Sequence, residues 1–213
     1  MGLTIYYNGR LRKAEDLPTL VEEIRDISNV YGWKYHIYNT HFPNDTFENH
    51  TSFENVYGIT FTPTNSESIS LAFLSNGVMV CPPSIQFFEG TENEKYIYSL
   101  FCKTQYAGVV VHQLIIHLFR YLSKKYFEDF NLKDESYYWE TDDESVMKER
   151  FEVYNSLLDN FVLSIETFPI EKGEDMVAYF ERMMKHVNSL RKNNEGDNKD
   201  CGEICTFVKN NQV

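Results

Sequence analysis

"SISLAFLSNGVMVCP", residues 68–82, predicts a β-hairpin, because apolar runs flank Asn76-Gly77 and this dipeptide favours tight hairpin turns. Two further runs lie on either side of it, "VYGITFTP" at 56–63 and "EKYIYSLFCKT" at 94–104. Both are rich in β-branched and aromatic residues, which suit a pleated, half-buried surface. Together the three runs predict an antiparallel meander.

The residues before the meander predict a strand, a helix and a second strand. "LTIYYNG", residues 3–9, has the composition of a strand. Between residues 15 and 33 apolar side chains recur at helical spacing, and Gly32 stands where a left-handed helix cap belongs. "WKYHIY", residues 33–38, alternates as a strand does, and residues 39–55 then form a long polar loop.

The residues after the meander predict helices over 109–127, 144–165 and 174–191, because each segment carries an apolar stripe at helical spacing. We interpret these stripes as packing faces. The order of the elements favours an α+β fold, with one antiparallel sheet of about five to six strands and three to four helices packed mainly on one face. Residues 1–192 are expected to form a single domain. Residues 193–213 are expected to form a polar linker and a tail that docks on it.

The composition limits the classes of partner that the protein can bind. Its 32 acids and 20 bases give a net charge of −12, which repels nucleic acid and anionic membranes and attracts a basic protein partner. No apolar run approaches the roughly 20 residues of a membrane span, and no signal peptide is recognised. Four cysteines without paired spacing fit reduced thiols. We therefore expect a cytoplasmic protein.

"DESYYWETDDESV", residues 134–146, is the stretch that is densest in reactive side chains. Thr141 and Glu144 have the spacing of a capping box, which satisfies free backbone N–H groups at a helix start. Asp142 and Asp143 would lie at the positive end of the same helix dipole. These acids are thus explained by the start of the predicted helix at 144.

The other half of this stretch leaves two alternatives open. If residues 134–140 are extended, each face of the strand carries an acid beside an aromatic ring. Such faces form either a ligand cradle or a rim where rings pack and carboxylates face water. The residues concerned are Asp134, Glu135, Tyr137, Tyr138, Trp139 and Glu140.

The predicted helix over 109–127 carries a polar stripe made of Gln113, His117, Arg120 and Lys124. This stripe faces either solvent or a polar cleft. His112 lies about a quarter-turn away, so the two histidines cannot chelate a metal as a pair four residues apart would.

Two other segments could bind an ion. Lys103, Gln105 and Tyr106 precede the same helix, at a strand-to-helix junction that can hold an anion, although the loop lacks the glycines of a phosphate cradle. The long loop holds two histidines, His41 and His50, but its spacing matches no metal motif. We predict no metal site and no cofactor.

The stretches "GWKYHIYN", "CKTQYAG" and "DESYYWET" resemble a group of bacterial proteins without an assigned function. The resemblance covers residues 3 to about 165 and leaves out the tail after 192. It implies no activity, cofactor or catalytic residue.

Two hypotheses about function follow. In the first, the protein is a non-catalytic binding module, comparable to immunity proteins that cover the basic active site of a toxin. The acids of 134–143 with Tyr137, Tyr138 and Trp139 would then form the contact surface. In the alternative, the protein is an enzyme or binds a small ligand. His117 would act as acid or base with Glu135 or Glu140, and Lys103 or Arg120 would hold an anionic group. That alternative requires these side chains to meet in one pocket.

Overall fold

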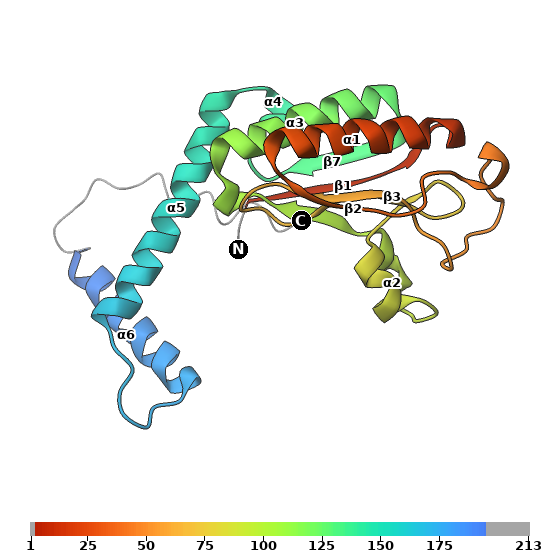
Figure 1. The fold of residues 1–213 in the computed structure, drawn as a ribbon. Coiled ribbons are helices and arrows are strands. Elements are labelled where there is room, and N and C mark those ends of the chain that lie inside the picture. The colour runs from red at the N-terminus through yellow and green to blue at the C-terminus, as the bar shows by residue number, and fades with distance from the viewer. Residues whose placement is uncertain (1–2, 195–213) are drawn as a thin grey trace. The chain divides into compact units, whose positions relative to one another are not determined.

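The computed structural model describes residues 3–194 and has an α+β fold with two antiparallel sheets. Figure 1 shows the arrangement of its elements. The strands are β1 (Thr4–Leu11), β2 (Lys34–Ile37), β3 (Tyr57–Thr62), β4 (Ile69–Phe73), β5 (Met79–Val80), β6 (Leu100–Lys103) and β7 (Phe127–Asp134). The helices are α1 (Leu17–Tyr31), α2 (Pro82–Phe88), α3 (Gly108–Lys125), α4 (Tyr138–Thr141), α5 (Glu144–Thr167) and α6 (Met176–Asn194).

Strand β1 joins the two sheets. Its first half is the centre of the three-stranded sheet β6–β1–β7, in which Ile5 lies opposite both Cys102 and Asp134. Its last residue reaches the four-stranded sheet β2–β3–β4–β5, where the N–H of Leu11 donates to the carbonyl of Gly77 at 2.9 Å. The turn of the β4–β5 hairpin, which contains Gly77, therefore fixes how the second sheet meets the first.

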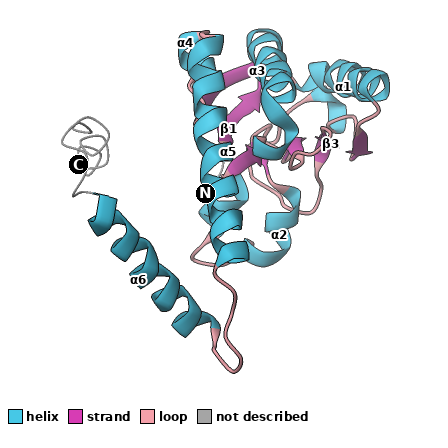
Figure 2. Cartoon of the chain, turned by 90° about the vertical axis from the view of Figure 1, so that its left-hand side faces the viewer, coloured by secondary structure: helices cyan, strands magenta, loops and turns pink. Residues whose placement is uncertain are grey.

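Helices α1 and α3 lie side by side over the same face of the sheets (Figures 1 and 2). The Tyr121 hydroxyl of α3 donates to Glu23 of α1 at 3.1 Å. Beneath the helices the buried side of β1 presents Ile5 and Tyr7, and the Tyr7 ring lies 4.7 Å from that of Phe119. Burial of each such large apolar side chain stabilises the fold by roughly 1.5–3 kcal/mol. This layer is the main core.

The hairpin predicted around Asn76-Gly77 is confirmed. Strands β4 and β5 pair antiparallel, with Phe73 opposite Met79, and Gly77 has the positive φ of 80° that the turn requires. The strand and helix predicted before the meander are confirmed as β1 and α1, and Gly32 caps α1 with a φ of 67°. These features depend on short-range sequence signals.

The prediction of a single sheet of five to six strands was wrong in detail. Strand β6 does not continue the meander but pairs with β1, and residues 94–98 before it form a 3₁₀ turn. Strand β7 was not predicted. At Asp129, where φ is 51°, the pairing of β7 with β1 shifts register, so Phe127 and Phe130 fall on one side with their rings 5.5 Å apart. Such a bulge hides the alternation by which strands are recognised.

The described residues contain six α-helices rather than three to four. The two additional helices are the short α2, whose first turn begins with two prolines, and the single-turn α4. The predicted α+β class itself is confirmed.

The chain divides into two compact units, residues 1–157 and residues from 158 onward, with α5 running from one into the other. The predicted tail lies outside the described residues from position 195. Among the described helices, none combines the length and the apolar character that a membrane crossing requires.

Candidate functional site

A buried polar cluster lies where β6, α3 and β7 meet. His112 of α3 is fully buried, and its Nδ1 lies 2.6 Å from the hydroxyl of Thr104, just after β6. Its Nε2 lies 3.2 Å from the carboxylate of Asp134, at the end of β7, and 2.8 Å from the hydroxyl of Ser136. One imidazole thus crosslinks three segments that are distant in sequence.

Asp134 also shapes the chain that follows β7. Its carboxylate accepts hydrogen bonds from the N–H groups of Ser136 at 2.9 Å, Tyr138 at 3.0 Å and Trp139 at 3.2 Å. These bonds turn the chain, and Tyr137 adopts a left-handed φ of 64° at the turn. Residues 134–140 are therefore not extended, so the condition under which acids and rings would alternate on two faces is not met.

The residue types of this cluster match those of a hydrolytic triad, but its geometry does not. In a triad the base lies between nucleophile and carboxylate, with one partner on each ring nitrogen. Here Ser136 and Asp134 both contact Nε2 of His112, and the Ser136 hydroxyl donates directly to Asp134 at 2.6 Å. Thr104, which contacts Nδ1, is fully buried. The cluster links three segments of the fold, and neither of its hydroxyls is exposed.

Burial acts to raise the pKa of the Asp134 carboxyl, but the hydrogen bond and attraction from His112 and the bonds from Ser136 outweigh it. The pKa in the folded protein is therefore lower than the usual value. A group of this kind contributes stability above the pKa of the unfolded chain and loses that contribution as the pH falls through the folded value.

We expect the difference in free energy of unfolding between the wild type and Asp134→Ala to shrink between about pH 5 and pH 3. In this range the Asp134 carboxyl of the unfolded chain becomes protonated, whereas the folded carboxyl, whose pKa is lowered, takes up its proton only at lower pH. Urea titrations of both proteins at several pH values measure the difference. A difference that stays constant over this range would contradict the role assigned to the ionised carboxylate.

The polar stripe of α3 faces α4 and the residues after it. Gln113 donates to the Tyr138 hydroxyl and to the carboxylate of Glu144, both at 2.9 Å. Nε2 of His117 lies 3.3 Å from the same Tyr138 hydroxyl. Arg120 packs over the Tyr138 ring, donates to its carbonyl at 2.8 Å and forms an ion pair with Asp142. The stripe therefore holds α4 in place.

The start of α5 differs from the predicted capping box. Asp143, rather than Thr141, accepts the N–H of Ser145, at 2.7 Å. This bond and others to Ser145 and Val146 lower the pKa of the Asp143 carboxyl. Thr141 belongs to α4, and its hydroxyl donates to the carbonyl of Tyr137.

The two carboxylates proposed as partners of His117 bond to main-chain groups. Glu135 accepts the N–H of Thr4 at 2.9 Å, and Glu140 accepts the N–H of Asp134 at 3.2 Å. Within the described residues, no hydrogen bond or ion pair joins His117 to either of them. The acids beside the stripe are instead Asp142 and Glu144.

The residues predicted to form an anion site before α3 differ in their exposure to solvent. Gln105 is buried, whereas Tyr106 is 73% exposed. Lys103 lies 4.0 Å from the carboxylate of Glu67, which also accepts the Lys103 N–H at 3.0 Å. A carboxylate of the protein itself thus occupies the neighbourhood of this lysine.

Most of the aromatic residues that were predicted to form a contact surface are buried or partly buried in the fold. Tyr138 is 3% exposed and Trp139 is partly buried against the core. Tyr137 remains 44% exposed, with the guanidinium of Arg150 4.9 Å from its ring centroid. The exposed part of this stretch is therefore acidic with a single aromatic ring.

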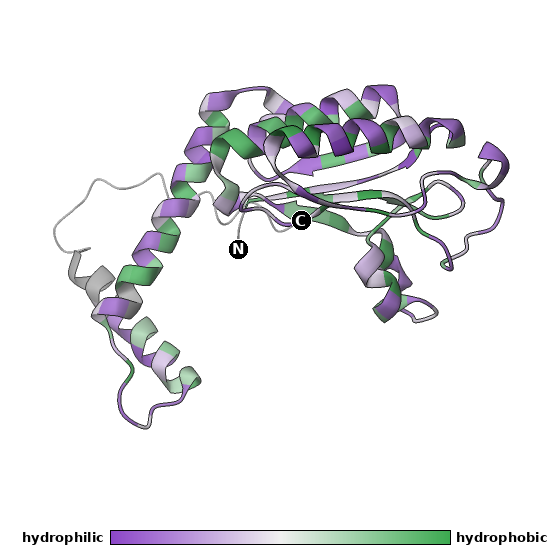
Figure 3. Cartoon of the chain, viewed as in Figure 1, coloured by the Kyte–Doolittle hydropathy of each residue, from purple (hydrophilic) through white to green (hydrophobic). Residues whose placement is uncertain are grey.

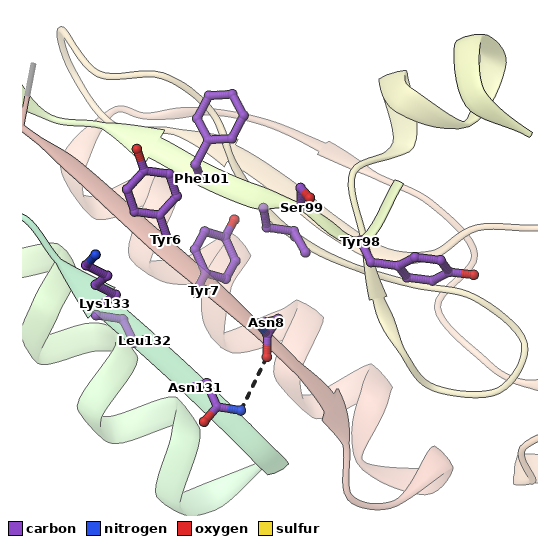
Figure 4. Close-up of a pocket in the computed structure, with 10 residues that line it drawn as sticks. Tyr6, Tyr7, Asn8, Tyr98, Ser99, Phe101, Asn131, Leu132 and Lys133 are labelled. Atoms are coloured by element: carbon purple, nitrogen blue, oxygen red, sulfur yellow. Dashed lines mark hydrogen bonds between the residues drawn. The ribbon is translucent and has the colours of Figure 1, made fainter. Parts of the chain in front are cut away.

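A second candidate site lies on the outer face of the sheet β6–β1–β7, the face turned away from α3. Register places Tyr6 of β1 between Phe101 of β6 and Lys133 of β7. In the next row Asn8 lies opposite Asn131, and the Asn131 amide donates to Asn8 at 3.4 Å. Figure 4 shows Tyr6 and Phe101 beside each other and Asn8 linked to Asn131.

These rows line a hollow of about 410 Å³ that also reaches Tyr98 and Ser99. A neighbouring hollow of about 250 Å³ shares Phe101 with it and reaches Glu67 and Cys81. Another of about 390 Å³ shares Asn8 and Asn131 and includes Arg10 and Asp129. Because the hollows share lining residues, we treat them as one groove, named the sheet groove below.

Sequence reasoning missed the sheet groove. The alternation of exposed Tyr6 and Asn8 with buried Ile5 and Tyr7 was a usable signal in β1. The rows across strands depend on the pairing of β1 with β6 and β7, and β7 was not predicted.

The comparisons with known proteins found no match for this chain among protein-family models, curated proteins or solved structures. Among the residues that the structure describes, no group of three or more histidine, cysteine, aspartate or glutamate side chains is arranged to hold a metal ion.

Proposed function

We propose that the protein is a non-catalytic binding module that holds an extended segment of a partner protein in the sheet groove. The observation that carries this proposal is the row formed by Lys133, Tyr6 and Phe101 across three strands. Tyr6 is 43% exposed and Phe101 48% exposed, and their ring centroids lie 6.4 Å apart. Exposed aromatic rings in a hollow are typical anchors of protein interfaces.

The chemistry of the lining supports binding rather than catalysis. Beside the rings stand the amides of Asn8 and Asn131, which can donate to and accept from a main chain. The residues that line the three hollows include no histidine, and their carboxylates, Glu67 and Asp129, lie in different hollows. An acid and a base arranged around one reacting atom would be needed for general acid–base catalysis.

The charge of the molecule supports a basic partner. Residues 1–157 hold 22 acids and 13 bases, a net charge of −9. Sheet faces with exposed rings can also stack nucleic acid bases, but this charge repels a phosphate backbone. The same field would steer a cationic polypeptide toward this unit, while the groove itself is locally balanced, with Lys133 and Arg10 against Glu67 and Asp129. We also propose a cytoplasmic location, and the unpaired Cys81 and Cys102 fit its reducing conditions.

The proposal predicts that peptides selected on this protein bind through the groove. A phage-displayed library of short random peptides would be selected against the full chain, and the affinity of the enriched peptides measured by calorimetry. We expect enrichment of basic peptides that contain apolar residues. Tyr6→Ala and Phe101→Ala should each weaken binding by about tenfold or more, because each removes an aromatic anchor.

Tyr137→Ala is the matched control, since Tyr137 is exposed to almost the same extent as Tyr6 but lies in the acidic stretch. It should leave the affinity unchanged within about twofold. Loss of binding in this variant alone would move the contact surface to residues 134–143. A selection that enriches no peptide would refute the proposed function.

A further inference from the structure

Helix α6 has two faces with different surroundings. One face packs on the turn that precedes the helix. Tyr179 is buried there, and Arg182 lies 4.2 Å from the ring centroid of Phe168. Arg182 also donates to the carboxylate of Glu174 at 2.6 and 2.7 Å. These bonds lower the pKa of Glu174 to about 2. The side chains on this face therefore find their contacts and hydrogen bonds within the second unit.

The other face is largely apolar and exposed. Val177, Phe180 and Met184 are exposed at spacings of three and four residues, so they form one stripe along the helix. Together with Glu181, Lys185 and Asn188 they line a hollow of about 500 Å³. Figure 3 shows apolar residues recurring along α5 and α6. Apolar side chains gathered in this way commonly mark an interaction surface.

The charged residues on this face indicate what covers it. Glu181 and Lys185 are one turn apart, both are exposed, and neither takes part in an ion pair within the described residues. When two copies of such a helix pack antiparallel about a two-fold axis at the level of residue 183, residue 181 of each lies opposite residue 185 of the other. Each glutamate then faces a lysine, and the apolar stripes meet beside these contacts.

We propose that this face of α6 is a dimer interface between two copies of the chain. The distribution of charge favours a second copy. Residues 158–194 hold six acids and five bases, whereas residues 1–157 carry a net charge of −9. Two acidic units repel each other, but two nearly neutral helices can approach closely. The inference is independent of the sheet groove, which lies wholly within residues 1–157.

Charge exchange tests this arrangement on the full chain. In Glu181→Lys two lysines face each other at both contacts of the dimer, and in Lys185→Glu two glutamates do. Sedimentation equilibrium should show a dimer for the wild type and at least a tenfold weaker association for each variant. A mixture of the two variants should dimerise again, because each lysine then faces a glutamate of the other chain. The double variant should likewise dimerise alone.

Lys172→Glu is the control, because it makes the same change of charge in the turn before α6, away from the apolar stripe. It should associate as the wild type does. Circular dichroism would show that every variant keeps its helix content. A wild type that is monomeric at all concentrations would overturn the proposal. So would a dimer that neither single exchange weakens, or a mixture of variants that fails to associate.

Discussion

Asp134→Ala is expected to lower the free energy of unfolding by about 4 kcal/mol. The carboxylate accepts bonds from His112, Ser136, Tyr138 and Trp139, and its own side chain is fully buried. Alanine removes the acceptor of all these donors, and only the Tyr138 N–H and the His112 ring keep the Ser136 hydroxyl as a neighbour, at 3.3 and 2.8 Å. A buried donor left unpaired costs more than its hydrogen bond contributed. The loss is large relative to the roughly 5–15 kcal/mol by which natural domains are stable. Urea unfolding followed by tryptophan fluorescence measures it.

Asp26→Ala serves as the control, because Asp26 is an exposed carboxylate on α1 whose ion-pair partner, Arg25, is a neighbour in sequence. It should change the stability by less than about 0.5 kcal/mol. If Asp134→Ala fails to fold, Ser136→Ala keeps the carboxylate and removes one hydroxyl, with an expected loss of about 1 kcal/mol. Losses below about 1 kcal/mol for Asp134→Ala would show that the cluster is not an anchor of the fold.

The buried cluster shows where prediction from sequence reached its limit. His112 was excluded as a metal ligand because of its angle to His117, and this argument from helix geometry concerns one helix only. Its actual partner is Asp134, which is placed beside α3 by the pairing of Ile5 with Asp134 across β1 and β7. A contact that depends on the register of an unrecognised strand has no short-range signal.

The polar stripe of α3 was predicted as a unit, and the structure keeps Gln113, His117 and Arg120 together. What covers the stripe could not be predicted, because α4 is a single turn held by Asp134 rather than by its own helix propensity. The hairpin at Asn76-Gly77 and the cap at Gly32 were predictable for the opposite reason. In both, the residue type itself selects the backbone conformation.

Gly58 in β3 is a position where the reason for glycine is not local. Its φ is 110°, a conformation that other residues rarely adopt. Its N–H donates to the carbonyl of Asn39 at 2.9 Å, and its own carbonyl accepts the N–H of Tyr38. On the side of β4, a Cβ atom would lie 2.3 Å from the carbonyl oxygen of Leu71. The residue is thus fixed by strands or loops on both sides.

Gly58→Ala is therefore expected to lower the free energy of unfolding by about 3 kcal/mol, from strain at positive φ and displacement of a main-chain carbonyl in β4. Gly32→Ala is the matched control, since Gly32 has a φ of 67° and an added Cβ would meet no atom within 4 Å. That variant should lose about 1 kcal/mol, from backbone strain alone. The difference between the two urea midpoints isolates the cost of the contact with Leu71. Equal losses would mean that β3 and β4 separate without cost, which the tight pairing of this sheet argues against.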